Sequence, residues 1–256
     1  MVNTLTELHP TRRFSNRVEN YVKYRPSYPA DIIPFFEKTF GLKPDQRIAD
    51  IGSGTGLFAE LLLVKGYKVT CIEPNPEMRK AAEAKLGHFK GFTSRKYRAE
   101  HTGLKSASVD LITVAQAFHW MNPEATKNEF QRILKPGGHI VLAWNIKQTN
   151  TPFLKAYDDL KQRFAIDDQQ PERINETIIE TFFAPASMKV HVFQNTQWLN
   201  FDALKGQLLS SSYIPLPGHE LYDDMISALA KLFVDFNENG AVRMDHETKL
   251  YYYEGE

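Results

Sequence analysis

The chain has 256 residues, of which 42% are hydrophobic and 24% are charged, a composition typical of a globular protein with a substantial core. Its 31 basic residues balance its 31 acidic residues, so no overall positive field attracts nucleic acid. A single cysteine, Cys71, excludes an intrachain disulfide and a cysteine-based metal site, and the apolar runs are too short to span a membrane. The histidines show no ligand spacing. We therefore expect a cytoplasmic protein with no metal, membrane or nucleic-acid partner.

The first feature along the chain is an aromatic and cationic segment at residues 21–29, which reads YVKYRPSYP. Tyr21, Tyr24 and Arg25 allow two interpretations: a surface arm packed by its prolines, or a lid over a bound ligand. As part of a lid, Arg25 could clamp a carboxylate with its planar guanidinium group. A helix is predicted over residues 29–39.

The most informative feature is the segment 48–56, which reads IADIGSGTG. An apolar strand runs directly into three glycines at alternate positions, Gly52, Gly54 and Gly56, and a helix follows over residues 56–65. Glycines let the backbone turn sharply and leave N–H groups facing a ligand. The competing interpretation is a tight turn that only packs the strand on the helix, but the strand–turn–helix context favours a binding loop.

The next predicted strand, residues 68–72, ends in Glu73 and Pro74. Glu73 follows the middle glycine by 19 residues, and an acid at the end of the second strand can accept hydrogen bonds from both hydroxyls of a ribose. The spacing G-x-G-x-G differs from the G-x-G-x-x-G of dinucleotide sites. Asp50 at the start of the loop would also repel a pyrophosphate. The pattern therefore favours a cationic, phosphate-free nucleoside ligand, with a nicotinamide-dependent oxidoreductase as the alternative.

Strands continue to alternate with helices up to about residue 145, which predicts βαβ units and a mainly parallel sheet. Further helices are expected over residues 76–86 and 123–134, and a strand over 109–115. Beyond residue 145 we expect helices over 151–164, 201–209 and 221–235, and strands over 188–199 and 242–252. We predict that helices around 151–183 and 201–238 form a cap over the strand ends, where ligands bind in such sheets.

Several motifs in this order resemble the class I S-adenosylmethionine-dependent methyltransferases. Residues 50–56 resemble motif I of that family, Glu73 its ribose-binding acid, and Arg98-Ala99-Glu100 the segment near the adenine amino group. Gln116-Ala117-Phe118-His119-Trp120 falls at the active-site mouth, and residues 134–138, LKPGG, resemble the turn before the fifth strand. Residues 21–29 are similar to the methyltransferase type 11 group, which includes trans-aconitate methyltransferase-like proteins. The chain departs from these relatives after Glu100, where it reads His-Thr-Gly-Leu.

The resemblance implies an α/β fold: a Rossmann-like, seven-stranded, mostly parallel sheet with an antiparallel edge strand, helices on both faces and a helical cap. It divides the chain into a lid and first helix (1–40), a cofactor-binding core (41–150), and a cap with final strands that complete the same domain (151–256). It implies S-adenosylmethionine as cofactor and S-adenosylhomocysteine as product. The predicted cofactor contacts are Tyr21, Arg25, Asp50, Gly52, Ser53, Gly54, Gly56, Glu73, Pro74, Ala99, Glu100 and Gln116.

Methyl transfer from a sulfonium needs alignment and exclusion of water rather than a protein nucleophile or a metal. We predict a small-molecule acceptor, and the aconitate-like resemblance favours a carboxylate. His119 is the candidate general base, or else a structural histidine. The predicted acceptor contacts are Tyr24, His119, Trp120, Trp144 and Tyr213, and Asn145 could face the same pocket as Trp144. A non-catalytic module that binds S-adenosylmethionine is a further alternative, and both a monomer and a homodimer fit the sequence.

Overall fold

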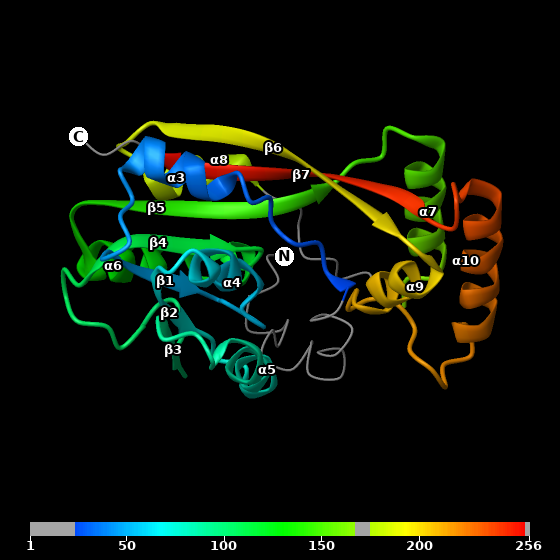
Figure 1. Cartoon of the computed structure of the whole chain (residues 1–256), viewed down its shortest axis with the longest axis horizontal. Coiled ribbons are helices and arrows are strands. Elements are labelled where there is room, and N and C mark those ends of the chain that lie inside the picture. Colours follow the sequence, from blue (N-terminus) through cyan, green and yellow to red (C-terminus); the bar gives the residue numbers. More distant parts are fainter. Residues whose placement is uncertain (1–23, 167–174, 254–256) are drawn as a thin grey trace.

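The computed structural model describes residues 24–166 and 175–253, and its centre is a seven-stranded sheet with strand order β3-β2-β1-β4-β5-β7-β6 (Figure 1). Strands β1 to β5 pair in parallel, and β7 runs antiparallel between β5 and β6. This confirms the predicted fold class. The strands are β1 (Arg47–Ile51), β2 (Lys68–Ile72), β3 (Phe92–Arg95), β4 (Val109–Ala115), β5 (Leu134–Lys147), β6 (Met188–Leu199) and β7 (Val242–Tyr253).

Helices begin where the sequence provides a cap. The Asn75 side chain accepts hydrogen bonds from two backbone N–H groups at the start of α5, and Asn122 accepts one at the start of α6. A proline follows each asparagine at the first helical position, where its missing N–H costs little. The helices are α3 (Ile32–Phe40), α4 (Leu57–Val64), α5 (Pro76–Leu86), α6 (Pro123–Ile133), α7 (Pro152–Arg163), α8 (Glu176–Phe183), α9 (Phe201–Leu209) and α10 (Tyr222–Phe236).

The sheet is covered on both faces. Helices α3 and α4 pack on one face, where Phe36 and Leu62 are fully buried, and α6 packs on the other through Phe130. Helix α8 also packs on this second face, because Phe182 lies in the same core and contacts the Phe118 ring edge-on. The prediction that residues up to 183 belong to the cap is therefore wrong for α8, whose apolar side chains complete the sheet core.

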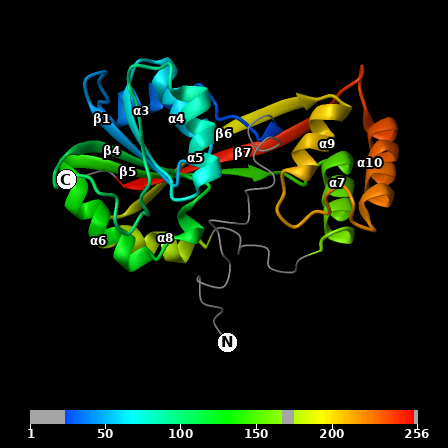
Figure 2. The same cartoon turned by 90° about the horizontal axis from the view of Figure 1, so that it is seen from below.

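The cap consists of α7, α9 and α10, which share a separate hydrophobic core with the far ends of β6 and β7. Both long strands extend past the rest of the sheet to reach these helices (Figures 1 and 2). The carboxyl ends of β1, β4 and β5 point toward the same end of the molecule (Figure 1). The cap thus stands beside the strand ends, as expected. Within the described ranges, no helix has the length and apolarity needed to cross a membrane.

Candidate active site

The glycine loop folds back onto the end of β2. The backbone N–H groups of Gly52 and Ser53 donate to the Ile72 carbonyl oxygen, at 2.8 Å and 3.2 Å. Gly52 has a φ of +68°, and a Cβ atom there would lie 2.6 Å from the Ala117 Cβ. Only glycine satisfies this combination of left-handed backbone and close approach. The close approach to Ala117 therefore explains the glycine at position 52, and the N–H groups of Gly52 and Ser53, which were expected to face a ligand, are instead paired with β2.

Glu73 is fixed at the end of β2 by hydrogen bonds to both carboxylate oxygens. The Gly54 N–H donates to Oε2 at 2.8 Å, and the Asn75 N–H donates to Oε1 at 2.7 Å. The side chain is 8% exposed, and burial raises its pKa although these two bonds and the Arg79 charge oppose that shift. The carboxylate retains lone pairs that can accept further hydrogen bonds, since each oxygen offers about two acceptor positions.

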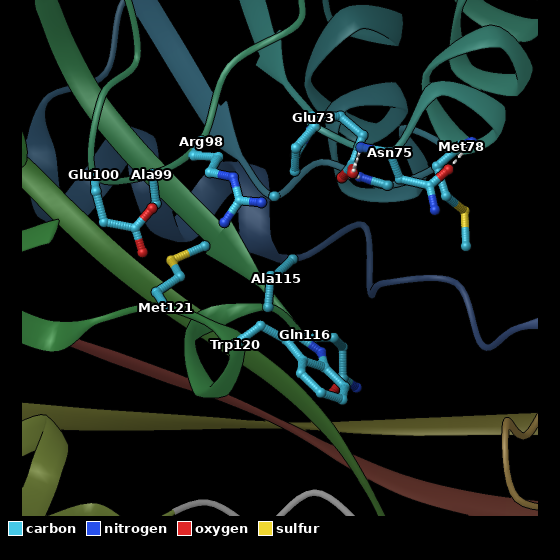
Figure 3. A pocket seen from close by; sticks show the side chains of 14 residues that line it. Glu73, Asn75, Met78, Arg98, Ala99, Glu100, Ala115, Gln116, Trp120 and Met121 are labelled. Carbon is cyan, nitrogen blue, oxygen red and sulfur yellow. Dashed lines mark hydrogen bonds between the residues drawn. The ribbon is translucent and has the colours of Figure 1, made fainter. Parts of the chain in front are cut away.

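A pocket opens between this loop and the ends of β3 and β4. We call it the loop pocket, and Figure 3 shows Glu73, Asn75 and Met78 on one side of it and Arg98, Ala99 and Glu100 on the other. The predicted site residues that line it are Gly52, Gly54, Glu73, Pro74, Ala99, Glu100, Gln116 and Trp120. The lining residues that were not predicted as contacts are Asn75, Met78, Arg98, Ala115, Ala117 and Met121.

The loop pocket fits a nucleoside-bearing cation. A Cβ atom at Gly54 would meet no atom within 4 Å, so the backbone here borders open space that a ligand can enter. Glu73 offers a carboxylate to ribose hydroxyls, and Glu100 offers a second one across the pocket (Figure 3). Apolar walls such as Met78 and Met121 suit the flat face of a base. These features match the chemistry of S-adenosylmethionine.

Residues 98–102 include the segment that resembles the family's adenine-contacting motif. They are held by hydrogen bonds to α6 and its cap rather than by a strand. Strand β3 ends at Arg95, three residues before Arg98. The Glu100 carboxylate instead accepts the Asn122 N–H at 3.0 Å, which ties it to the start of α6. Thr102 donates to the Glu129 carboxylate from both its N–H and its hydroxyl, at 2.7 Å and 2.6 Å. These bonds hold the residues after Glu100, where the sequence departs from the family pattern, in an ordered turn.

Asp50 lies beneath the glycine loop and is fully buried. Its Oδ1 accepts the Thr113 hydroxyl at 2.8 Å, while Oδ2 has no hydrogen-bond partner among the described residues. Burial raises the Asp50 pKa to about 7, and the Glu73 charge contributes in the same direction. A carboxyl group of this kind gains charge when a cation binds nearby. Asp50, Ser53 and Gly56 do not line the loop pocket, so their predicted cofactor contacts stay predictions.

We expect cofactor affinity to depend on pH through Asp50. Its raised pKa means that the carboxyl is largely protonated below about 7 and charged above it, and only the charged form attracts a cationic ligand. S-adenosylmethionine should therefore bind roughly three- to tenfold more tightly at about pH 8 than at about pH 6. In Asp50→Asn this step should disappear, and the two proteins should converge at the lower pH. Calorimetric titration of both proteins between about pH 6 and about pH 8 tests this role of Asp50. The same change of affinity with pH in Asp50→Asn as in the wild type would contradict it.

Gln116 joins the loop pocket to a second pocket. Its backbone has a φ of +56°, unusual for a residue other than glycine, and its Nε2 donates to the Asn145 carbonyl oxygen at 3.1 Å. Residues held in such conformations concentrate at functional sites. Gln116 is among the lining residues of both pockets.

The second pocket, which we call the cap pocket, lies between the sheet and the cap. Its lining comes from the N-terminal segment, β5, β7, α7 and α9. Arg25 reaches it from the predicted lid segment, and its Nη2 donates to the Ser210 carbonyl oxygen at 3.2 Å. The described lining residues are Arg25, Pro26, Tyr28, Leu57, Gln116, Asn145, Lys147, Tyr157, Lys161, Gln207, Ser210, Ser211 and His246.

Some predicted acceptor contacts lie elsewhere. Trp144 is 5% exposed and packs edge-on against Tyr251 in the sheet core. Side chains alternate along a strand, so Asn145 faces the cap pocket and Trp144 faces the opposite side; the prediction for Trp144 is wrong. The Tyr24 ring packs over Gly206, where a Cβ atom would lie 2.0 Å from it. The Tyr213 ring contacts Lys161 but is not among the residues that line the cap pocket. Tyr21, which was predicted as a cofactor contact, lies outside the described residues.

His119 lies on the short helix Phe118–Trp120 after β4, and its ring is tilted against that of Trp120, with 4.9 Å between ring centroids. It is half-buried and lines neither of the two pockets. Burial lowers its pKa to about 4, so the ring is neutral near pH 7 but is a weak base. Its predicted catalytic role therefore stays a prediction, and the geometry gives it no direct contact with the site.

The cap pocket contains residues that sequence analysis missed. Lys147, Tyr157, Lys161, Gln207 and His246 converge there from four elements that are far apart in the chain. The alternating pattern of residues 242–252 indicates that His246 faces inward with its apolar neighbours, and this was the available signal for a buried polar group. The lysines carried no comparable signal, since a lysine on an amphipathic element is usually solvated.

The fold and the loop pocket define a Rossmann-like enzyme for a phosphate-free nucleoside cofactor, and comparison with known proteins agrees. A family model for a methyltransferase domain matches residues 49–142. An uncharacterized methyltransferase of Mycobacterium tuberculosis is 30% identical over 200 residues, covering 78% of this chain and 76% of that protein. A Dictyostelium discoideum protein named as a methyltransferase is 31% identical over 166 residues, covering 63% of this chain and 61% of that protein.

Solved structures show the same fold. A type II methyltransferase structure from Anaeromyxobacter dehalogenans superposes with a TM-score of 0.70 at 20% identity, covering 90% of this chain and 98% of that one. The phosphoethanolamine N-methyltransferase 2 of Haemonchus contortus, in complex with S-adenosylhomocysteine, gives a TM-score of 0.57 at 16% identity, covering 100% of this chain and 60% of that one. The chain belongs to the methyltransferase family. It is a class I S-adenosylmethionine-dependent methyltransferase, which replaces the nicotinamide-dependent alternative.

Proposed function

We propose that this methyltransferase acts on a small molecule held in the cap pocket, and that a carboxylate oxygen is the methylated atom. The observation that carries the proposal is the junction of the two pockets at Gln116. When bound in the loop pocket, S-adenosylmethionine supplies an electrophilic methyl group that an acceptor atom attacks in line. The chain's own contribution is then to hold the acceptor at the junction and to exclude water from it.

The chemistry of the junction favours an acceptor that needs no deprotonation. Burial lowers the pKa of His246, which lines the cap pocket, and of His119, which follows Gln116 by three residues, to about 4 in each case. A general base works best with a pKa near the operating pH, so neither ring is suited to remove a proton from an amine or a phenol. A carboxylate already carries the required lone pair at pH 7.

The substrate proposal is tested by measuring S-adenosylhomocysteine formation with a panel of small carboxylic acids and their matched amides and alcohols. We expect turnover with acids only. Mild alkali should then release methanol from the product, because a methyl ester hydrolyses whereas an N-methyl or ether product does not. Turnover confined to the amides or alcohols, or a base-stable product, would contradict methylation at a carboxylate.

His119→Gln should reduce turnover by less than about tenfold, because a carboxylate acceptor requires no general base. The measurement is kcat and KM for the best acid of the panel, with the melting temperature as a check on folding. A loss of about 10²-fold or more in kcat at unchanged stability would restore His119 as the catalytic base.

A further inference from the structure

We propose that Tyr157 and His246 form a subsite of the cap pocket that binds a hydroxyl group of the acceptor, a group other than the one that is methylated. This inference rests on the proposed function, because it takes the cap pocket as the place where the acceptor binds. The subsite recognises an uncharged group that donates one hydrogen bond and accepts another, and a primary amide shares this chemistry. Together with the proposed methylation at a carboxylate, the inference describes the acceptor as a hydroxy acid.

Tyr157 brings an unpaired hydroxyl group to the cap pocket. The residue lies on α7 and lines the pocket, and its side chain is only 2% exposed. The hydroxyl has no hydrogen-bond partner among the described residues. Burial raises the Tyr157 pKa, so the hydroxyl keeps its proton at neutral pH and can donate it. Buried polar groups in folded proteins are nearly always paired, and a ligand in the pocket would supply the partner.

His246 contributes a hydrogen-bond acceptor to the same pocket. It is 5% exposed, and its Nδ1 has no hydrogen-bond partner among the described residues. Burial lowers its pKa to about 4, so the ring is neutral near pH 7, although a hydrogen bond with the Asn195 backbone opposes this shift. A bond that raises the pKa of a histidine is one that the ring donates. The ring proton therefore belongs to Nε2, which leaves the unpaired Nδ1 as an acceptor.

The fold places these two residues in one part of the pocket. His246 on β7 is the direct cross-strand partner of Lys147 on β5, and side chains of such partners point to the same face of a sheet. The Lys147 Nζ lies 5.2 Å from the centre of the Tyr157 ring. Both residues therefore adjoin the same lysine. Lys147 is itself paired with Asp158, so the subsite depends on the neutral groups beside it rather than on its charge.

The two unpaired groups select a ligand by what each lacks. Nδ1 of His246 needs a donor, and the Tyr157 hydroxyl can supply a proton to an acceptor. A carboxylate has no hydrogen to donate to Nδ1, and an ammonium has no lone pair for the Tyr157 proton. A hydroxyl group donates through its hydrogen and accepts through its oxygen, so it pairs both groups at once. A primary amide achieves the same with its NH2 and its carbonyl oxygen.

The subsite recognises this group without activating it. Tyr157 and His246 line the cap pocket but not the loop pocket, so they hold a part of the acceptor away from the cofactor. With a pKa of about 4, His246 is too weak a base to remove the proton of an alcohol. The bound hydroxyl therefore stays protonated, and its role is to fix the acceptor so that another group lies at the Gln116 junction.

The test is calorimetry on the full chain saturated with S-adenosylhomocysteine. The probes are butyrate, each of its monohydroxy derivatives, γ-aminobutyrate and succinamate, the primary amide. We expect at least one hydroxybutyrate to bind roughly tenfold or more tightly than butyrate, and γ-aminobutyrate to show no such gain. A gain with succinamate rather than with a hydroxybutyrate would identify the recognised group as an amide.

Tyr157→Phe removes only the hydroxyl. We expect the variant to bind hydroxybutyrate no more tightly than butyrate, and its melting temperature should not fall, because the hydroxyl has no partner to lose. The matched control is Tyr67→Phe. Tyr67 is also 2% exposed and does not line the cap pocket, and its hydroxyl donates to Glu37 at 2.7 Å. This control should melt at a lower temperature and keep the preference for hydroxybutyrate.

His246→Leu removes the acceptor and should likewise abolish the preference, and Tyr157→Phe decides the matter if His246→Leu does not fold. The inference is overturned if no hydroxybutyrate and no amide binds more tightly than butyrate, since water alone would then pair the two groups. It is also overturned if Tyr157→Phe keeps the preference. If S-adenosylhomocysteine binds but none of the acids does, butyrate included, the result contradicts the proposed function and this inference with it.

Discussion

Glu73→Gln is expected to weaken binding of S-adenosylmethionine and S-adenosylhomocysteine by roughly 10- to 100-fold, about 1.4 to 3 kcal/mol, while the fold is kept. The wild-type carboxylate accepts the Gly54 and Asn75 N–H groups on its two oxygens and lines the loop pocket. An amide has only one oxygen, so in either orientation its NH2 group would face one of these two backbone donors. The change removes both the charge for ribose hydroxyls and one anchor of the glycine loop.

The matched control for Glu73 is Glu77→Gln. Glu77 is an exposed acid four residues further on, in the first turn of α5, and it does not line the loop pocket. Calorimetry with both adenosyl ligands should show unchanged affinity in the control. Equal affinities of Glu73→Gln and wild type would show that this carboxylate does not contact the cofactor.

The second large effect is expected for Gly54→Leu, which should abolish measurable cofactor binding but cost only about 1–2 kcal/mol of stability. Gly54 has a φ of +56°, and a Cβ atom there meets no protein atom within 4 Å. The leucine side chain therefore has room, but the room is the loop pocket itself. The stability cost comes from placing an L-residue in the left-handed region.

Gly41→Leu separates these two effects. Gly41 has a φ of +63°, a Cβ atom there would likewise meet no atom within 4 Å, and the residue ends α3 away from the loop pocket. The variant should lose about as much stability as Gly54→Leu, judged from denaturant unfolding, and should bind cofactor normally. If both variants retained full affinity, the space beside Gly54 would not be the cofactor site.

Much of the fold was predictable because local signals and tertiary packing agree in it. Helix α5 starts at Pro76 as expected, since an asparagine cap and a proline mark its first turn. The alternation of residues 242–252 correctly indicated a strand, and it forms β7. Helix α8 was assigned to the wrong layer because an amphipathic pattern shows that one face is buried but not which partner covers it.

The loop pocket was more predictable than the cap pocket because its main residues lie close together in the sequence. Gly52, Gly54 and Glu73 lie within one βαβ unit, so their spacing in sequence determines their spacing in space. Lys147, Lys161 and His246 meet only because the end of β5, the extended strand β7 and helix α7 come together in the folded chain. Trp144 and Asn145 were predicted to share a pocket, but strand alternation sends them to opposite faces.

The central claim is that the loop pocket binds S-adenosylmethionine for transfer of its methyl group. Calorimetric titration of the full chain with S-adenosylmethionine and S-adenosylhomocysteine, alongside NAD and NADP, tests it most directly. We predict saturable one-to-one binding of both adenosyl ligands and no competition from either dinucleotide. Preferential binding of NAD or NADP, or no binding of the adenosyl ligands, would contradict the account.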